Sequence, residues 1–185
     1  MKTLSRLMLT KILRWKIVGD FPDLKRSIII FAPHTSYFDG LYGKLYLMHC
    51  GIRHKFLSKE EFFRFPMKYL FYAFGSIPVF RNKKYIDQII TLMNTNEMHI
   101  IVSPEGQLTK TTHWKKGYFY MAKGANVPIV VGYLDYKRKE IGIRKVIYDL
   151  SDMQQVMQEI AKLYSTVTAK HPDCFSVDNS LLNCI

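Results

Sequence analysis

The hydrophobic residues of this chain fall into short segments whose spacing alternates between the patterns of strands and helices. A continuous apolar run of about four to eight residues is typical of a strand buried on both faces of a sheet. The clearest such run is SIIIFA at 27–32, which ends at Pro33. The same criterion predicts further strands at 54–57, 76–80, 98–102, 127–134 and 141–148.

Between these runs the apolar residues recur at helical spacing. The clearest amphipathic helix follows Ser151, which begins a Ser-x-x-Gln capping box. A second capping box, from Ser58 to Glu61, predicts a helix through about Phe74 that Pro66 interrupts. The remaining helices are expected at 36–50, 84–95 and 115–124.

The N-terminal segment 4–18 is predicted to be a helix that is apolar over most of its circumference. Arg6, Lys11, Arg14 and Lys16 interrupt it, so it lacks the apolar core of a signal peptide and is assigned to the mature protein. Such a helix packs either against protein or at a lipid interface, and the sequence leaves both readings open. The chain contains no run of about 18 apolar residues, which argues against an ordinary transmembrane helix.

This alternation indicates an α/β fold. We expect a single domain with a mixed, mostly parallel central sheet flanked by helices, plus an N-terminal amphipathic helix. The length of 185 residues fits one domain. The expected division is an N-terminal helix at 1–20 that is a candidate membrane contact, the domain proper at 21–170, and a tail at 171–185.

Composition narrows the class of protein. Hydrophobic residues make up 48% of the chain and charged residues 23%, a globular balance that argues against a disordered chain. The formal net charge of +12 attracts nucleic acid, anionic lipid or an acidic protein without distinguishing among them. The three cysteines form no C-x-x-C pair, which argues against a disulfide framework or a zinc site.

The segment FAPHTSYFDG at 31–40 contains residues capable of acid–base chemistry. His34 directly follows the predicted buried strand, where ligands tend to bind in α/β sheets, and a turn would bring Asp39 to it. The carboxylate would orient the imidazole, whose other nitrogen can then accept a proton. No serine stands in a nucleophile elbow, so the nucleophile would come from the substrate. The alternative is a purely structural His–Asp hydrogen bond.

Two further segments follow predicted strands. In SPEGQLTK at 103–110, Glu105-Gly106 is predicted to lie in a turn. Glu105 would hold a substrate hydroxyl or organise loop amides; the alternative is an ordinary turn without a functional role. In GSIPVFR at 75–81, Arg81 is either a phosphate ligand or an ordinary surface cation.

Taken together and in order, these segments resemble the glycerophospholipid acyltransferase family, which includes the 1-acyl-glycerol-3-phosphate acyltransferases. The resemblance is to a short bacterial-type member and spans roughly residues 15–140. It rests on four blocks: H-x-x-x-x-D (His34, Asp39), G-x-I-x-x-x-R (Gly75, Ile77, Arg81), P-E-G (Pro104, Glu105, Gly106) and V-P-I (Val127, Pro128, Ile129).

The resemblance implies transfer of a fatty acyl group from acyl-CoA or acyl carrier protein to a hydroxyl of a lyso-lipid, classically 1-acyl-glycerol-3-phosphate. It implies that His34 is the general base and that Asp39 orients it. The acceptor would be held by Arg81, Glu105, Gly106 and Lys110. The resemblance implies no cofactor and no metal. Acyl-CoA or acyl carrier protein takes part as a co-substrate.

The sequence departs from the family at one place. The family commonly reads P-E-G-T-R, whereas Gln107 and Leu108 follow the glycine here. Leucine cannot bind an anion, and Lys110, Lys115 or Lys116 would replace a bidentate arginine only as a point charge. The phosphate on the acceptor is therefore in question, and another head group, such as that of an aminoacyl lipid, is also compatible.

The expected location is cytoplasmic and peripheral, on the inner face of the cell membrane. An anionic membrane surface suits the basic chain, and the N-terminal helix and the aromatic segment 62–74 are candidates for contacting lipid. Core packing is the alternative for the aromatic segment.

Two other functions are compatible with the sequence. A lipid-binding protein of the same fold without catalysis is suggested by Leu108. A basic module that stacks bases on Tyr and Phe is less well supported, because no nucleic-acid motif accompanies them and no specific nucleic-acid partner is expected.

Overall fold

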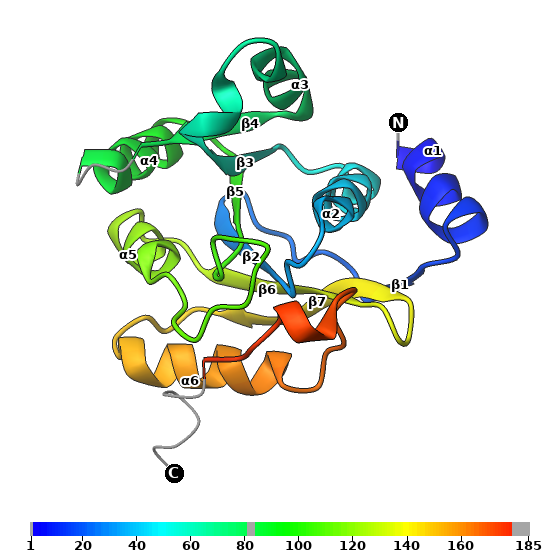
Figure 1. The fold of residues 1–185 in the computed structure, drawn as a ribbon. Coiled ribbons are helices and arrows are strands. Elements are labelled where there is room, and N and C mark those ends of the chain that lie inside the picture. The colour runs from blue at the N-terminus through cyan, green and yellow to red at the C-terminus, as the bar shows by residue number, and fades with distance from the viewer. Residues whose placement is uncertain (1, 81–83, 179–185) are drawn as a thin grey trace.

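The computed structural model describes residues 2–80 and 84–178, and within them a seven-stranded sheet organises the chain in the order β1-β7-β6-β2-β5-β3-β4 (Figure 1). Strands β6 and β7 pair antiparallel, and every other neighbouring pair is parallel. The predicted mixed, mostly parallel sheet is therefore confirmed. The strands are β1 (Lys16–Val18), β2 (Ser27–Ala32), β3 (His54–Lys59), β4 (Ser76–Val79), β5 (His99–Val102), β6 (Ile129–Asp135) and β7 (Glu140–Ile147).

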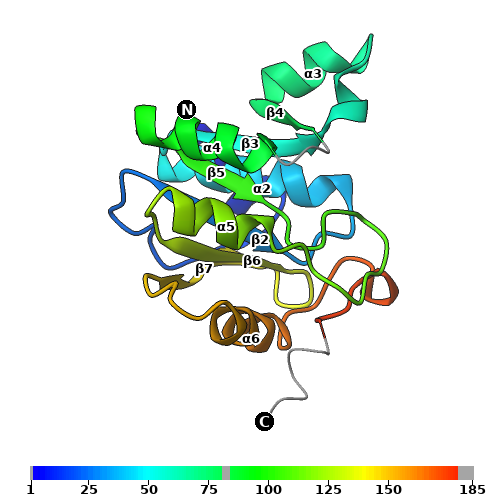
Figure 2. The same ribbon diagram turned by 90° about the vertical axis from the view of Figure 1, so that its left-hand side faces the viewer.

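Helices cover both faces of this sheet. The N-terminal helix and α2 pack on one face, and α4, α5 and α6 pack on the other (Figures 1 and 2). The helical elements are α1 (Lys2–Leu7), η1 (Met8–Ile12), α2 (Tyr37–Cys50), η2 (Glu60–Phe63), α3 (Met67–Phe74), α4 (Lys84–Thr95), α5 (Gly117–Gly124), α6 (Met153–Tyr164) and η3 (Pro172–Cys174).

The apolar run of β2 lies at the centre of the sheet, as its sequence predicted. Successive side chains of a strand point to opposite faces. Ile28 and Ile30 therefore enter the cluster under α4, α5 and α6, while Ile29 and Phe31 enter the cluster under α2 and the N-terminal segment. All six residues of the strand are buried.

The N-terminal segment departs from the single helix predicted at 4–18. The helix ends at Ile12, and residues 16–18 form the edge strand β1, which pairs with β7. The chain changes direction at Arg14, whose φ is 58°. Leu9 and Trp15 are buried against α2 and the sheet, whereas Leu4, Leu7 and Ile12 are exposed. The partner strand is more than 120 residues away along the chain, and local spacing could not reveal it.

Neither predicted capping box forms. Ser58 lies within β3 and donates to Ser76 Oγ of β4 at 3.2 Å, and the short 3-10 helix η2 follows it. The interruption at Pro66 is confirmed, because α3 begins only after it. At α6 the cap is Asp152 in place of Ser151: its Oδ1 accepts from the backbone N–H groups of residues 154 and 155 at 2.8 and 3.2 Å.

Residues 171–178, expected to belong to a tail, fold back onto the domain. The Trp114 indole Nε1 donates to the Ser176 carbonyl at 3.1 Å, and the Trp114 backbone N–H donates to Asp178 Oδ2 at 3.1 Å. This return path carries the segment after α6 past the ends of β2 and β6, where it meets the candidate site.

Candidate active site

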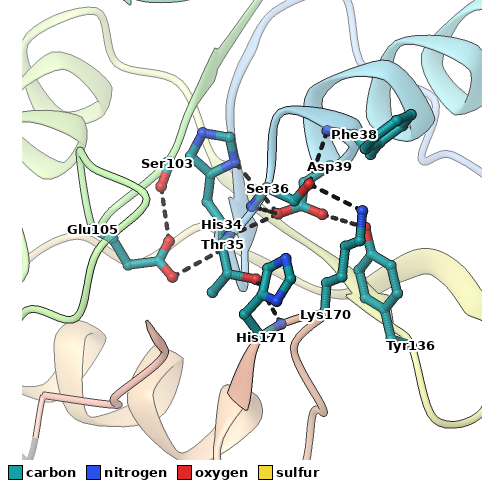
Figure 3. Close-up of polar contacts among 10 residues, drawn as sticks. All are labelled: His34, Thr35, Ser36, Phe38, Asp39, Ser103, Glu105, Tyr136, Lys170 and His171. Carbon is teal, nitrogen blue, oxygen red and sulfur yellow. Dashed lines mark hydrogen bonds and ion pairs between the residues drawn. The ribbon is translucent and has the colours of Figure 1, made fainter. Parts of the chain in front are cut away.

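Strands β5, β2 and β6 are adjacent and parallel, so their carboxyl ends lie at one edge of the sheet. This edge is where ligands bind in open α/β sheets. The residues that follow these strands gather there: His34 after β2, Glu105 after β5 and Tyr136 after β6 (Figure 3). The first two were predicted from sequence.

Asp39 is fixed by the start of α2. Ser36 is the N-cap, and its side-chain oxygen accepts from the Phe38 N–H at 3.3 Å. Asp39 Oδ2 in turn accepts from the backbone N–H groups of Thr35 at 2.7 Å and Ser36 at 2.8 Å. The carboxylate thus satisfies amide donors that a helix start leaves unpaired. Asp39 therefore lies in the first turn of α2, and its side chain is only 2% exposed.

His34 lies next to this carboxylate. Its Nδ1 is 3.8 Å from Asp39 Oδ2, and its side chain is 31% exposed (Figure 3). The distance exceeds a hydrogen bond, although such contacts are often long before substrate binds. Burial lowers the pKa of His34, an effect that the negative charge of Asp39 opposes. The site therefore holds a neutral imidazole with one nitrogen facing Asp39 and the other facing away from it.

Glu105 ties the loop after β5 to His34. Its Oε1 accepts from the His34 backbone N–H at 2.9 Å, and its Oε2 accepts from Ser103 Oγ at 2.8 Å. The residue is 3% exposed. Burial raises the pKa of Glu105 to about 7, against the opposing effect of its two hydrogen bonds. Because both oxygens have protein donors, the geometry favours a role in organising the loop and the His34 backbone over direct contact with substrate.

This raised pKa predicts a pH-dependent stability. The folded state binds the Glu105 proton more tightly than the unfolded state, whose pKa is near 4.5. The resulting stabilisation is full below about pH 4.5 and is lost as the pH rises through about 7, a change on the order of 3 kcal/mol. Glu105→Gln removes the titration and keeps the shape of the side chain. The difference between its free energy of unfolding and that of wild type, measured by urea titration, is expected to move in favour of the variant as the pH rises from 4.5 to 8.

The matched control is Glu60→Gln at an exposed glutamate. Curves of unfolding free energy against pH that run parallel for wild type and Glu105→Gln would contradict this interpretation.

The other predicted binding residues are distributed along the loop. Gly106 is exposed and has a φ of 67°, a conformation that favours glycine. The stem of Lys115 lies beside it, because a Cβ at this position would be 3.2 Å from Lys115 Cγ. Lys110 is exposed, further along the loop. Arg81 lies outside the described residues.

Three residues near the site were not predicted. The Tyr136 hydroxyl donates to Asp39 Oδ1. Lys170 Nζ donates to Ser36 Oγ at 3.3 Å and lies 4.1 Å from the centre of the Phe38 ring. The His171 N–H donates to Thr35 Oγ1 at 3.2 Å (Figure 3). Tyr136, like His34, directly follows a buried strand, but the sequence alone does not show that this strand lies beside β2.

Comparisons with known proteins agree with this geometry. The structure resembles the crystal structure of the 1-acyl-sn-glycerophosphate (LPA) acyltransferase PlsC from Thermotoga maritima, with a TM-score of 0.62 and 14% sequence identity. The likeness covers 98% of this chain and 76% of that one, and it establishes the fold. A comparison with curated proteins found no match. The sequence model of a family described as Acyltransferase matches residues 14–133, a span that includes His34, Asp39 and Glu105. The chain therefore belongs to the acyltransferase family.

Proposed function

We propose that this acyltransferase moves a fatty acyl group from acyl-CoA or acyl carrier protein to a hydroxyl of a lyso-lipid, with His34 as the general base. The observation that carries the proposal is the neutral, partly exposed imidazole whose Nδ1 faces the buried carboxylate of Asp39. This arrangement activates a hydroxyl, and the family supplies the acyl chemistry.

In the proposed reaction, His34 Nε2 accepts the proton of the acceptor hydroxyl as its oxygen attacks the thioester carbonyl. The new C–O bond forms, the C–S bond breaks, and the proton passes from the imidazolium to the departing thiolate. Asp39 stabilises the imidazolium while it exists. Nothing is left on the enzyme, and the transfer uses no metal and no cofactor.

The acceptor's polar head would lie against the loop at Glu105-Gly106. The stem of Lys115 lies beside Gly106, and Lys110 is exposed in the same loop. Gln107 donates its amide to the carbonyls of Thr109 and Lys110, both at 3.4 Å, so it serves the loop itself. A phosphate or another head group of the acceptor is therefore compatible with the described part of this loop, whose cations are lysines acting as point charges.

An apolar surface beside the site suits a bilayer. We define the α3–α2 surface by Phe65, Met67, Tyr69, Leu70 and Tyr72 around α3 and by Tyr37, Phe38 and Leu41 on α2, each at least 41% exposed. The Phe74 ring lies 3.9 Å from the Cβ position of Gly40, so the two helices adjoin. Helix α3 stands out from the edge of the sheet at β4 (Figures 1 and 2). Among the described residues, no helix is long and apolar enough to cross a membrane.

The double variant Phe65→Asp/Leu70→Asp is expected to weaken vesicle binding at least tenfold. Each side chain contributes about 1.5–3 kcal/mol when it is buried in an apolar environment. Co-sedimentation with vesicles containing phosphatidylglycerol measures the effect, and Tyr120→Asp on α5 is the matched control. Equal binding by the double variant and wild type would show that the membrane contact lies elsewhere.

The proposed function is tested with ¹³C-labelled acyl thioesters and a panel of lyso-lipids that differ in head group. Mass spectrometry of the products is expected to show an acylated lyso-lipid, and the head group that reacts fastest identifies the acceptor. Vesicle binding without transfer from any donor would instead support the lipid-binding alternative. Tight, specific binding of RNA or DNA at physiological salt, without transfer, would support the nucleic-acid alternative.

A further inference from the structure

Asp39 has a partner that lies outside the span matched by the family. Its Oδ2 accepts from two backbone N–H groups and faces His34, and its Oδ1 accepts from the Tyr136 hydroxyl. The side chain of Asp39 is 2% exposed. Without the Tyr136 hydroxyl, its Oδ1 would be buried with no donor among the described hydrogen bonds. Donors on both oxygens therefore fix the orientation of the carboxylate.

Tyr136 is itself firmly held. Its ring packs edge-on against Trp15, with 5.0 Å between ring centres and 84° between planes, and lies 6.3 Å from Tyr42 of α2. Its backbone N–H donates to the Thr168 carbonyl at 2.9 Å. Contacts from the N-terminal segment, from α2 and from the segment after α6 therefore all fix the position of one hydroxyl. Burial raises the pKa of Tyr136, so the hydroxyl stays protonated and remains a donor.

We propose that Tyr136 is a positioning residue for the acyl transfer, which holds the Asp39 carboxylate oriented toward His34. The inference rests on the proposed function for its kinetic consequences. It assigns a role to the residue that follows strand β6. This residue lies outside the four sequence blocks, because the V-P-I block ends at Ile129, the first residue of the strand.

Other charged and titratable groups surround Asp39 and bear on any pH dependence. They come from its own loop, from α2, from the loop after β5 and from the segment after α6. They are His34, Tyr42, Glu105, Lys170 and His171. Tyr136 is the side chain among the described hydrogen bonds that donates directly to the Asp39 carboxylate.

Tyr136→Phe tests this proposal, because it removes the hydroxyl and keeps the ring packing. We expect kcat at the pH plateau to fall about tenfold with little change in the acceptor KM, since a hydrogen bond to a charged group is lost. Without this donor, the Asp39 carboxylate is held less firmly toward His34, so its charge raises the pKa of His34 less. The acid limb of the pH–rate profile is therefore expected to move to lower pH, by less than in Asp39→Asn.

The control is Tyr148→Phe, which removes a hydroxyl from a ring that is 68% exposed beyond β7. A double-mutant cycle gives the sharper criterion. If Tyr136 acts through Asp39, then Tyr136→Phe is expected to have almost no further effect on kcat in an Asp39→Asn background. Full additivity of the two effects, or an unmoved acid limb, would overturn the proposal.

A second measurement does not depend on activity. The titration of the His34 ring, followed by NMR with ¹³C-labelled histidine and assigned with His34→Ala, is expected to shift downward in Tyr136→Phe and to stay unchanged in Tyr148→Phe. An unchanged His34 titration in folded Tyr136→Phe would refute the inference even if the protein transfers acyl groups. A shifted titration in a protein without transfer would refute the proposed function alone.

Discussion

His34→Ala is expected to lower kcat for acyl transfer by about 10²–10⁴-fold, the usual contribution of a positioned general base. The hydroxyl of a lyso-lipid is a poor nucleophile until its proton is removed, and Nε2 of His34 is the proposed acceptor of that proton. The side chain is partly exposed and is not part of either hydrophobic cluster, so the variant is expected to keep its fold and its affinity for vesicles. Initial rates of ester formation measure the loss, and circular dichroism checks the fold.

The control for this variant is His113→Ala. His113 is exposed, and its described hydrogen bonds involve only its backbone. Near-normal transfer by a folded His34→Ala protein, with a donor and an acceptor that wild type uses, would eliminate His34 as the base.

Asp39→Asn is expected to lower kcat by about 10²–10³-fold. The amide oxygen can still accept from the Thr35 and Ser36 N–H groups, so the start of α2 is preserved while the negative charge is lost. The imidazolium formed during the reaction is then no longer stabilised. Because the charge of Asp39 raises the pKa of His34, its removal lowers that pKa further. The acid limb of the pH–rate profile is expected to move to lower pH, in the same direction as for Tyr136→Phe and further.

The control for Asp39→Asn is Asp87→Asn, which removes an exposed carboxylate from the first turn of α4. Both variants lose one negative charge near a helix start, so general charge effects cancel in the comparison. An acid limb that moves equally in the two variants would show that Asp39 has no specific action on His34.

The central strand of the fold and the His34–Asp39 pair of the site could be predicted because their sequence signals are local. Five of the six residues of β2 are apolar, a run that a strand buried on both faces explains well. His34 follows this strand directly, and Asp39 lies in the first turn of the next helix. The errors lie where a distant partner decides the structure. Local spacing extended the N-terminal helix to residue 18, whereas pairing with β7 makes residues 16–18 a strand.

The same reasoning explains which site residues were missed. Tyr136 and Lys170 reach the start of α2 from 97 and 134 residues along the chain, respectively. Their sequence context alone resembles that of any strand end or exposed loop. Only the order of the parallel strands and the return of the segment after α6 bring them to Asp39 and Ser36.

The central claim is that the acceptor hydroxyl attacks the thioester directly, without an acyl-enzyme. A rapid-quench single turnover of wild type with a ¹³C-labelled acyl thioester and the acceptor found by the panel tests it most directly, with intact-protein mass recorded at each time. The account predicts that thioester loss and ester formation follow one rate, require the acceptor, and leave the protein mass unchanged. An acylated protein that forms before the ester would contradict it.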